Sequence, residues 1–498
     1  MKKKFIAIMA IAALVLSSCG SKAAANKETS ETEAKSESRE VKKKKSKSST
    51  KKSETKKLEY ELLEPAIFYR GSEYTPLSIN ANVPDIKVES GLSNIENIDQ
   101  FGNLNDLQRE MIEKNGFVVN PTNSEQIFYI YEDNSYNKIP NFITTDSTLQ
   151  LYHIFYDYAL RQTESEKLYT ELKQLNKNMV EILTKKYDDT SDKKKKLLIG
   201  KTLAYFALCE KLLDAEESSL PSEINSIVEE EYSNIKSEST GISAISGAKL
   251  DYSLFKVRGH YTRSEELKQY FAAMSMYGVI PFNFYDDAGK KNVDGAYMSI
   301  VATSALHELS SEAGMDLWED IYVITEFFVG SSDDINPMQL SSIIQAVYGK
   351  MPEPDEIGEG IDSFYDELEK LKNSRISDGA SGETGLCFRF MGQRYIPDSE
   401  ILDRLSNELR PFPSGLDVMA VLGSERAEEI LDTVYKPSED WPEYKDEYKK
   451  VKKEFDAKSV SEKTVNIYNT WLFTLESLNQ SFPEGYPSFM RNTSWEDK

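Results

Sequence analysis

Two short segments contain the residues whose types and spacing could do chemistry. In PNFITTDSTLQLYHIFYDYALR, Asp146 lies near an expected helix start and His153 follows two turns later. An imidazole and a carboxylate brought together could transfer protons, whereas the simpler alternative is a core histidine held by hydrogen bonds. In FKVRGHYTRSEE, Arg258, His260 and Arg263 surround a glycine before an expected helix. This second segment is predicted either to bind an anion or to form a turn whose arginines pair with acids.

A third segment, residues 389–426, combines turns with many arginines inside an acidic chain. Internal ion pairs would explain this composition, and so would a concave face that binds an acidic or sugar-like ligand. The candidate ligand-binding residues are therefore Arg258, Arg263, Arg394 and Asp417. The candidate catalytic residues are His153, Asp146 and His260.

Complete catalytic and cofactor motifs are missing from the sequence. HELSSE at His307 resembles the start of a zinc-protease motif, but Ser311 stands where the second imidazole is required. The chain also has no nucleophile elbow, no phosphate-binding glycine loop and no dinucleotide fingerprint. We therefore predict no metal site and no cofactor.

The His153 segment is expected to form one helix. Pro140 keeps the residue before it extended, a cap follows at Thr144, Thr145 or Asp146, and the helix runs to about Thr163. Apolar residues occupy nearly all sides of this helix, which predicts that it is buried.

Helical signals predominate in the rest of the chain. Asn336 and Pro337 begin a helix that Gly349 ends, and an apolar stripe over residues 467–478 predicts another. TRSE at residues 262–265 matches a capping box, whereas EQIFYIYED at residues 125–133 fits a strand or a helix. We predict a mainly α fold, a large multi-helix globular body with few or no strands. Segments rich in Gly, Pro, Asp and Ser are predicted to be long loops: 281–295, 330–336, 374–385 and 411–415.

The N-terminus has the pattern of an export signal. Three lysines precede an apolar run at residues 5–16, which is shorter than the roughly 20 residues of a membrane-spanning helix. LSSC at residues 16–19 resembles a bacterial lipobox, which predicts a signal peptide over residues 1–18 and a lipid on Cys19. The alternative is an ordinary signal peptide with a chance cysteine. The protein is thus expected to be exported and anchored to the outer face of the bacterial cell membrane.

Composition then divides the chain into a tether, residues 19–58, and a body, residues 59–498. The tether is rich in Lys, Ser and Glu and lacks aromatic residues, so we expect it to be disordered. Residues 1–58 carry 16 Lys and Arg against 6 Asp and Glu, whereas the other 440 residues carry 44 against 77. The acidic body argues against nucleic-acid binding, and the basic tether suits contact with anionic envelope polymers or membrane.

Two cysteines remain in the body, Cys209 and Cys387, each in an apolar setting. Export would permit a disulfide between them, but sequence alone cannot place their Cα atoms within bonding distance. Two free core thiols are the favoured prediction.

Several long motifs together resemble one known family. PNFITTDSTLQLYHIFYDYALR, DYSLFKVRGHYTRSEELKQYF, FFVGSSDDINP, FRFMGQRYIPDSEI, PFPSGLDVMAVLGSERA and EGYPSFMRNTSWEDK occur in the order typical of the DUF3160 family of bacterial and archaeal exported proteins. The resemblance covers about residues 100–498. It implies a mostly helical secreted body, often behind a lipoprotein signal, and it implies no specific chemistry because the family's function is undetermined.

The sequence departs from this family pattern in three places. Gln150 stands where members often have a histidine, so the resemblance does not support a paired-imidazole metal site at His153. Val257 stands where a proline usually precedes Arg-Gly-His. Related chains look as though they continue past the residues that match SWEDK. We therefore expect the C-terminus of this chain to be shortened relative to the family.

Two functions remain open at the level of sequence. The preferred prediction is a lipid-anchored protein that binds a ligand or partner at the cell envelope. The alternative is an envelope hydrolase acting on peptide or glycan, with a site formed by His153, Asp146, His260 and Arg258. An enzyme requires these groups to converge within hydrogen-bond reach in a cleft.

Overall fold

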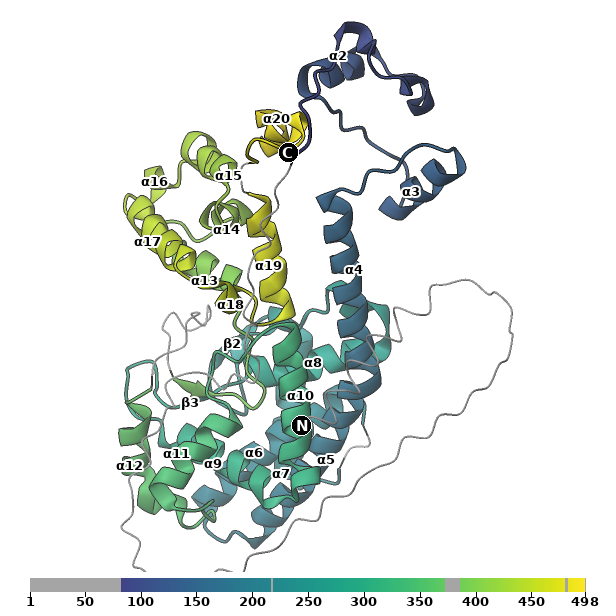
Figure 1. The fold of residues 1–498 in the computed structure, drawn as a ribbon. Coiled ribbons are helices and arrows are strands. Elements are labelled where there is room, and N and C mark those ends of the chain that lie inside the picture. The colour runs from purple at the N-terminus through teal and green to yellow at the C-terminus, as the bar shows by residue number, and fades with distance from the viewer. Residues whose placement is uncertain (1–81, 216–217, 372–385, 480–481, 498) are drawn as a thin grey trace, which may run out of the picture. The chain divides into compact units, whose positions relative to one another are not determined.

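The structure is a computed structural model that describes residues 82–215, 218–371, 386–479 and 482–497. The predicted signal peptide, Cys19, the tether and the loop at 374–385 lie outside the described residues. Helices predominate in the described part, and its strands form two short antiparallel pairs (Figure 1). The predicted mainly α fold is therefore confirmed.

The first described elements include two short α-helices. Residues 125–133, which fitted a strand or a helix, are helical for most of their length. Asn105 caps the helix before them, where it accepts a hydrogen bond from the Gln108 N–H at 2.9 Å. The elements of this part are η1 (Ser90–Leu92), η2 (Ile98–Phe101), α2 (Asp106–Asn115) and α3 (Ile127–Tyr136).

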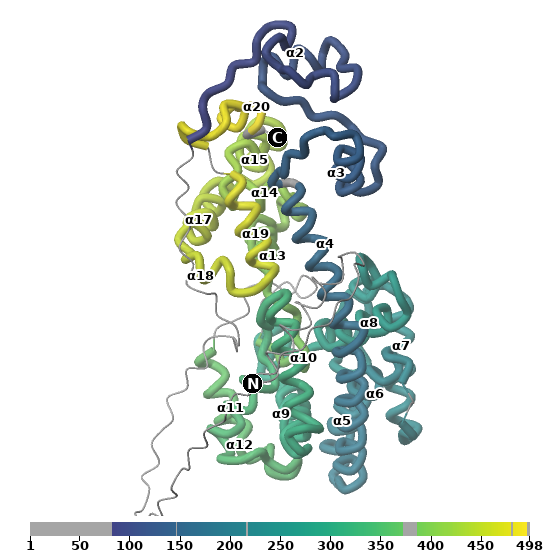
Figure 2. Tube along the Cα trace, turned by 45° about the vertical axis from the view of Figure 1, so that its right-hand side comes forward, coloured from purple at the N-terminus to yellow at the C-terminus, as the bar shows by residue number. Residues whose placement is uncertain are grey.

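The larger buried cluster is built around helix α6 (Lys193–Leu212). This helix is apolar on nearly all sides, and helices pack against several of its faces: α5, α7, α8 and α9. Both views show α5, α6 and α7 side by side (Figures 1 and 2). The other helices of this part are α4 (Thr145–Thr163), η3 (Glu164–Leu168, a π turn), α5 (Tyr169–Asp189), α7 (Ser222–Ser237), α8 (Glu265–Val279), α9 (Val293–Glu308), α10 (Met315–Phe328), α11 (Pro337–Tyr348) and α12 (Ile357–Leu368).

Short strands and single turns join these helices. The two strand pairs are antiparallel, and Phe282 lies opposite Phe388 in the second. This second pair brings residues that follow α8 next to residues more than one hundred positions later in the chain. The connecting elements are β1 (Thr240–Ile242), β2 (Lys249–Asp251), η4 (Tyr252–Phe255), η5 (Gly259–Arg263), β3 (Phe282–Asn283), η6 (Ser311–Ala313) and β4 (Cys387–Phe388).

Capping residues explain where two of the predicted helices begin. Asn336 and Gln339 form a capping box at the start of α11, and Gly349 ends that helix in the left-handed conformation, as predicted. The predicted capping box at residues 262–265 is wrong. Thr262 lies inside η5 and donates to the Gly259 carbonyl, so Ser264 takes the cap of α8 by accepting from the Leu267 N–H at 3.2 Å.

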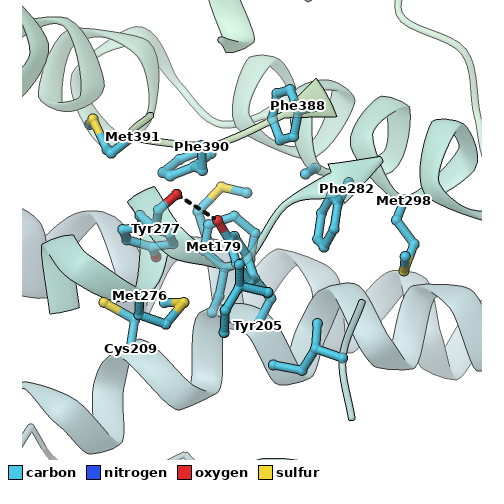
Figure 3. Packing of buried hydrophobic residues seen from close by; sticks show 14 of the residues in the cluster. Met179, Tyr205, Cys209, Met276, Tyr277, Phe282, Met298, Phe388, Phe390 and Met391 are labelled. Carbon is cyan, nitrogen blue, oxygen red and sulfur yellow. Dashed lines mark hydrogen bonds between the residues drawn. The ribbon is translucent and has the colours of Figure 1, made fainter. Parts of the chain in front are cut away.

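Aromatic residues form the centre of the larger cluster (Figure 3). Tyr205 on α6 donates a hydrogen bond to the Tyr277 carbonyl on α8 at 3.4 Å. The Phe390 ring lies 5.1 Å from the Tyr277 ring, so the chain after β4 is held against α8. Cys209 and Cys387 are both buried and unbridged, which confirms two free core thiols.

A second buried cluster forms from the C-terminal helices. It includes Ile401, Val451 and Leu472. The predicted helix at residues 467–478 is present as α19, which also contacts α4 through a hydrogen bond from the Tyr152 hydroxyl to the Ile467 carbonyl at 2.8 Å. The elements of this part are α13 (Pro397–Arg404), α14 (Gly415–Val421), α15 (Glu425–Ile430), η7 (Leu431–Tyr435, a π turn), α16 (Pro437–Asp440), α17 (Tyr444–Asp456), α18 (Val460–Lys463), α19 (Ile467–Leu478), η8 (Ser488–Arg491) and α20 (Thr493–Asp497).

Candidate ligand-binding site

A pocket lies along one side of α8. Its volume is about 980 Å³, near the upper end of the roughly 300–1,000 Å³ typical of small-molecule sites. Helix α8 supplies one wall, and residues 389–394 supply part of another. The residues most relevant to binding are Glu164, Arg258, Tyr270, Phe271, Gln393 and Arg394.

Glu164 is a buried carboxyl group in the pocket wall, and its side chain is only 4% exposed. It begins the π turn between α4 and α5, a distortion that often occurs at functional sites. It accepts a hydrogen bond from the Tyr261 hydroxyl at 2.8 Å and lies 2.9 Å from His260 Nε2. Burial raises the pKa of Glu164, and the hydrogen bonds from His260 and Tyr261 only partly oppose this shift.

His260 is held between two carboxylates. Its Nε2 faces Glu164, and its Nδ1 lies 3.7 Å from Oδ1 of Asp157. Asp157 also pairs with Arg263 at 3.1 Å and with Arg161 at 3.8 Å. Both imidazole nitrogens thus face acids, so His260 ties η5 to α4 and positions Glu164.

Tyr270 places a hydroxyl at the pocket wall without a hydrogen-bond partner. The residue is 1% exposed, and no described residue accepts from or donates to its Oη. Burial raises the pKa of Tyr270 well above its usual value, the charge of Glu164 adds to the rise, and the charge of Arg394 opposes it. Tyr270 is therefore a neutral hydroxyl near both an acid and a guanidinium.

Arg394 is fixed by α10 and has one unpaired nitrogen. Its guanidinium lies 4.2 Å from the centre of the Tyr322 ring, and Nη2 donates to Thr325 Oγ1. Nη1 is buried and has no hydrogen-bond partner in the described residues. The exposed Arg258 also lines the pocket, with its guanidinium 5.9 Å from the centre of the Phe271 ring.

Backbone pairing determines where Arg394 lies. Residues 331–335 run beside residues 387–395, with hydrogen bonds from Asp333 N to Gln393 O at 3.1 Å and from Tyr395 N to Ser331 O at 2.9 Å. A buried ion pair between Arg389 and Asp334, 2.6 Å long, links the same two segments. Figure 3 shows Phe390 and Met391 above Tyr277, so their packing anchors the chain just before Arg394.

The pocket includes only some of the predicted site residues. Arg258 and Arg394 line it, and His260 touches it through Glu164. Arg263 is paired with Asp157 instead. Asp417 is fully buried in the second cluster, where it accepts from Arg410, Ser414 and Tyr444.

The predicted burial of the His153 helix is wrong for its first half. His153 is exposed, and its ring lies 6.4 Å from the Trp471 ring on α19. Leu151 and Ile154 are also exposed, because α4 packs against α19 on one face and reaches the larger cluster only near Leu160. Asp146 lies in the first turn of α4, and only its backbone is described.

Sequence reasoning missed both Glu164 and the unpaired hydroxyl of Tyr270. Tyr270 shares a helix face with Leu267, Phe271 and Met274, and helical spacing does not reveal that its hydroxyl is unpaired. Glu164 lies in the polar stretch TESEK, where no motif marks it. Its importance arises only when η5 packs over it.

Two further properties concern only the described residues. They contain no group of three or more His, Cys, Asp or Glu that could hold a metal ion. They also contain no helix with both the length and the apolarity of a bilayer span.

Comparisons with known proteins address the family. The curated proteins contain no match to this chain, and the solved structures contain none either. The family model described as "Protein of unknown function (DUF3160)" matches residues 105–498, a range that includes every residue lining the pocket. The chain therefore belongs to the DUF3160 family.

Proposed function

We propose that the protein binds a small polar ligand in the pocket beside α8, as a lipid-anchored protein of the cell envelope. The observation that carries this proposal is the pair of unsatisfied buried groups at the pocket wall, the Tyr270 hydroxyl and Arg394 Nη1. Leaving such a group without a partner costs about 1–3 kcal/mol. A ligand that supplies hydrogen-bond acceptors would remove this cost.

Apolar residues in the same pocket support binding of an organic molecule. Leu160, Leu250, Phe271, Met274 and Val279 line it together with the polar groups. Small-molecule sites typically combine a mostly apolar wall with a few polar groups that fix the ligand's orientation.

Hydrolysis remains the second candidate because of Glu164. A carboxyl group whose pKa is raised by burial and that lines a pocket is suited to act as a general acid. The arrangement of His260 favours binding, since both of its nitrogens face carboxylates and neither is available to activate a nucleophile. Mass spectrometry of a bound compound before and after incubation separates the two functions: binding leaves it intact, whereas a hydrolase releases fragments that Glu164→Gln abolishes.

The pocket can be tested with a variant that fills it. Ser275 on α8 lines the pocket, and Ser275→Trp would place an indole in it. Ser233 on α7 is exposed and absent from the lining, so Ser233→Trp is the matched control. Thermal unfolding with a panel of sugars, sugar acids, amino acids and dipeptides is expected to show compounds that stabilise the wild type and the control but not Ser275→Trp. Equal stabilisation of all three proteins would overturn the proposal.

The envelope location is proposed from Cys19 and the basic tether. A lipid on Cys19 would hold the body outside the cell, and the tether would lie against anionic membrane or wall polymers. Cys19→Ala is expected to release the protein into the medium, whereas Ser38→Ala in the tether should leave it membrane-bound. Retention of Cys19→Ala on membranes would exclude lipidation of this residue as the anchor.

A further inference from the structure

Most arginines in the described part of this acidic protein are paired with acids. Among the ten described arginines, seven lie within 4.0 Å of a carboxylate: Arg161, Arg263, Arg389, Arg404, Arg410, Arg426 and Arg491. Arg109, Arg258 and Arg394 have no such partner among the described residues. Two of these three line the same pocket, so the pocket has two guanidinium groups with no carboxylate within 4.0 Å among the described residues.

We propose that the ligand is a small monocarboxylate and that Arg394 and Tyr270 bind its carboxylate. This inference rests on the proposed function of the pocket. Arg394 Nη1 and the Tyr270 hydroxyl are both donors without acceptors, and a carboxylate offers two acceptor oxygens. The exposed Arg258, at the same pocket, would attract the anion from solvent.

Arg394 is preorganised for this role. Tyr322 and Thr325, one turn apart on α10, hold its guanidinium by stacking and by a hydrogen bond to Nη2. Little side-chain entropy remains to be lost when an anion binds to the other nitrogen. Both unpaired atoms are shielded from water beneath the pocket surface, so binding requires a small side-chain movement at the wall.

Acidic residues of the pocket limit the charge of the ligand. Asp251, Asp286 and Asp287 line it, and the first two accept hydrogen bonds from backbone N–H groups of their own turns. Their charges disfavour nucleotides, polyphosphates and other multiply charged anions. The amide side chains of Asn283 and Gln393 can bind hydroxyl groups, which fits a hydroxylated acid such as a sugar acid.

The test compares charged and neutral forms of the same molecule. D-glucuronate carries a carboxylate where D-glucose, the neutral analogue, carries a hydroxymethyl group. Acetate and inorganic phosphate separate a carboxylate from another small anion. The anions are titrated as sodium salts and glucose as the neutral sugar, all at constant ionic strength, and the midpoint of thermal unfolding, Tm, is measured.

The variants are chosen so that charge loss alone cannot explain the result. Arg394→Gln removes the proposed carboxylate ligand, and Tyr270→Phe removes the second donor. Arg109→Gln removes an arginine outside the pocket that also lacks a carboxylate partner among the described residues, and it is the matched control. Carboxylates are expected to raise the Tm of the wild type and Arg109→Gln, with an apparent Kd at least tenfold weaker in Arg394→Gln and Tyr270→Phe.

The possible outcomes separate this inference from the proposed function. Glucose and glucuronate could stabilise the wild type equally, with the effect lost in Ser275→Trp. This result would leave the pocket proposal intact and would overturn the inference that the ligand is a carboxylate. Stronger stabilisation by phosphate than by any carboxylate would also overturn it. Stabilisation by carboxylates that is unchanged in Arg394→Gln would place the anion elsewhere. A panel in which no carboxylate shifts the Tm of the wild type contradicts the inference as well.

Discussion

At the scale of single residues, the Tyr270 hydroxyl is expected to lower the free energy of unfolding of the ligand-free protein, because it is buried without a hydrogen bond to compensate. Its hydroxyl is buried and unpaired, so Tyr270→Phe removes an unsatisfied polar group while keeping the ring. We expect this variant to gain about 1 kcal/mol in free energy of unfolding, measured by urea denaturation without ligand. Buried polar groups without a hydrogen-bond partner are rare in proteins, and one at a pocket wall is typical of a functional site. A loss of stability of similar size would instead indicate that the hydroxyl has a partner within the protein.

Glu164 gives stability a pH dependence of unusual sign for an acid. Its pKa is raised above the ordinary value of 4.5 in the folded state, mainly by burial, while His260 and Tyr261 lower it and the charge of Asp157 raises it further. Between these two pKa values the folded protein binds more protons than the unfolded chain, so Glu164 makes unfolding easier as pH rises through this window.

Glu164→Gln should remove this dependence. Urea denaturation of the wild type and the variant at about pH 5 and about pH 8 is expected to show that the variant gains stability relative to the wild type as pH rises. Glu454→Gln is the control without this dependence, because a hydrogen bond from Arg404 lowers the pKa of Glu454 and its carboxyl is therefore ionised in both the folded and unfolded states between about pH 5 and about pH 8. If the difference in stability between the wild type and Glu164→Gln is the same at both pH values, the folded-state pKa of Glu164 is not raised.

Sequence reasoning found the cations of the site but not the groups between them. Arg258 was singled out beside a glycine before an expected helix and Arg394 in a turn-rich segment of an acidic chain, and both line the pocket. Whether a charged side chain forms an ion pair depends on contacts across the fold, which the sequence does not show. Arg263 and Asp417 were therefore equally good candidates from the sequence, but both form ion pairs within the protein. The role of Glu164 depends on η5, which follows it by nearly one hundred residues.

At the scale of elements, Gly392 determines how closely the segment carrying Arg394 can approach its neighbour. A Cβ atom at this position would lie 2.2 Å from Ser332 Oγ and 3.0 Å from Asp334 Oδ2. Gly392→Ala therefore has to separate residues 331–335 from residues 387–395. We expect a loss of about 1–3 kcal/mol in free energy of unfolding and weaker ligand binding, because Arg394 moves with its segment.

A second glycine variant controls for the effect of the added methyl group. Gly358 lies inside α12, and a Cβ atom there would meet nothing within 4 Å. Gly358→Ala should raise stability by about 0.5–1 kcal/mol, since alanine favours a helix, and should leave binding unchanged. Equal effects of the two variants would show that the close approach at Gly392 is not what holds Arg394.

Local signals predicted individual elements wherever one short stretch contained the whole cause. The helices at 337–348 and 467–478 follow from caps and apolar spacing that lie within the helices themselves. The burial of α4 was not predictable in this way. Apolar residues on a helix indicate a tendency to be buried, but they do not show which other elements will cover them. The two strand pairs also escaped notice, since each involves only two or three residues per strand.

At the scale of the whole molecule, sequence patterns were sufficient to predict the fold class but not to locate the site. Apolar periodicity over many segments predicts a helical body, and the structure confirms it. The pocket joins residues 258–278 to residues 389–394, and such a meeting of distant segments requires knowledge of packing that one sequence does not contain. The net negative charge of the body was informative only in the same general way. It argued against polynucleotide partners, but it did not show which arginines lack a carboxylate partner.

The two hydrophobic clusters suggest that the molecule does not unfold in one step. The larger cluster extends from Leu160 to Met391 and includes pocket residues, whereas the second extends from Ile401 to Leu472. Regions with separate cores often unfold at different temperatures. We therefore expect calorimetry to resolve two transitions, and a pocket ligand to raise only the transition that belongs to the larger cluster.

Matched leucine substitutions assign the two transitions. Leu203 in the larger cluster and Leu405 in the second are both 0% exposed, so Leu203→Ala and Leu405→Ala each create a comparable cavity. Each should destabilise its own cluster by about 2–5 kcal/mol and lower one transition while shifting the other little. If both variants lower a single transition together, the clusters unfold as one cooperative unit, and a ligand bound beside α8 would then protect the C-terminal helices as well.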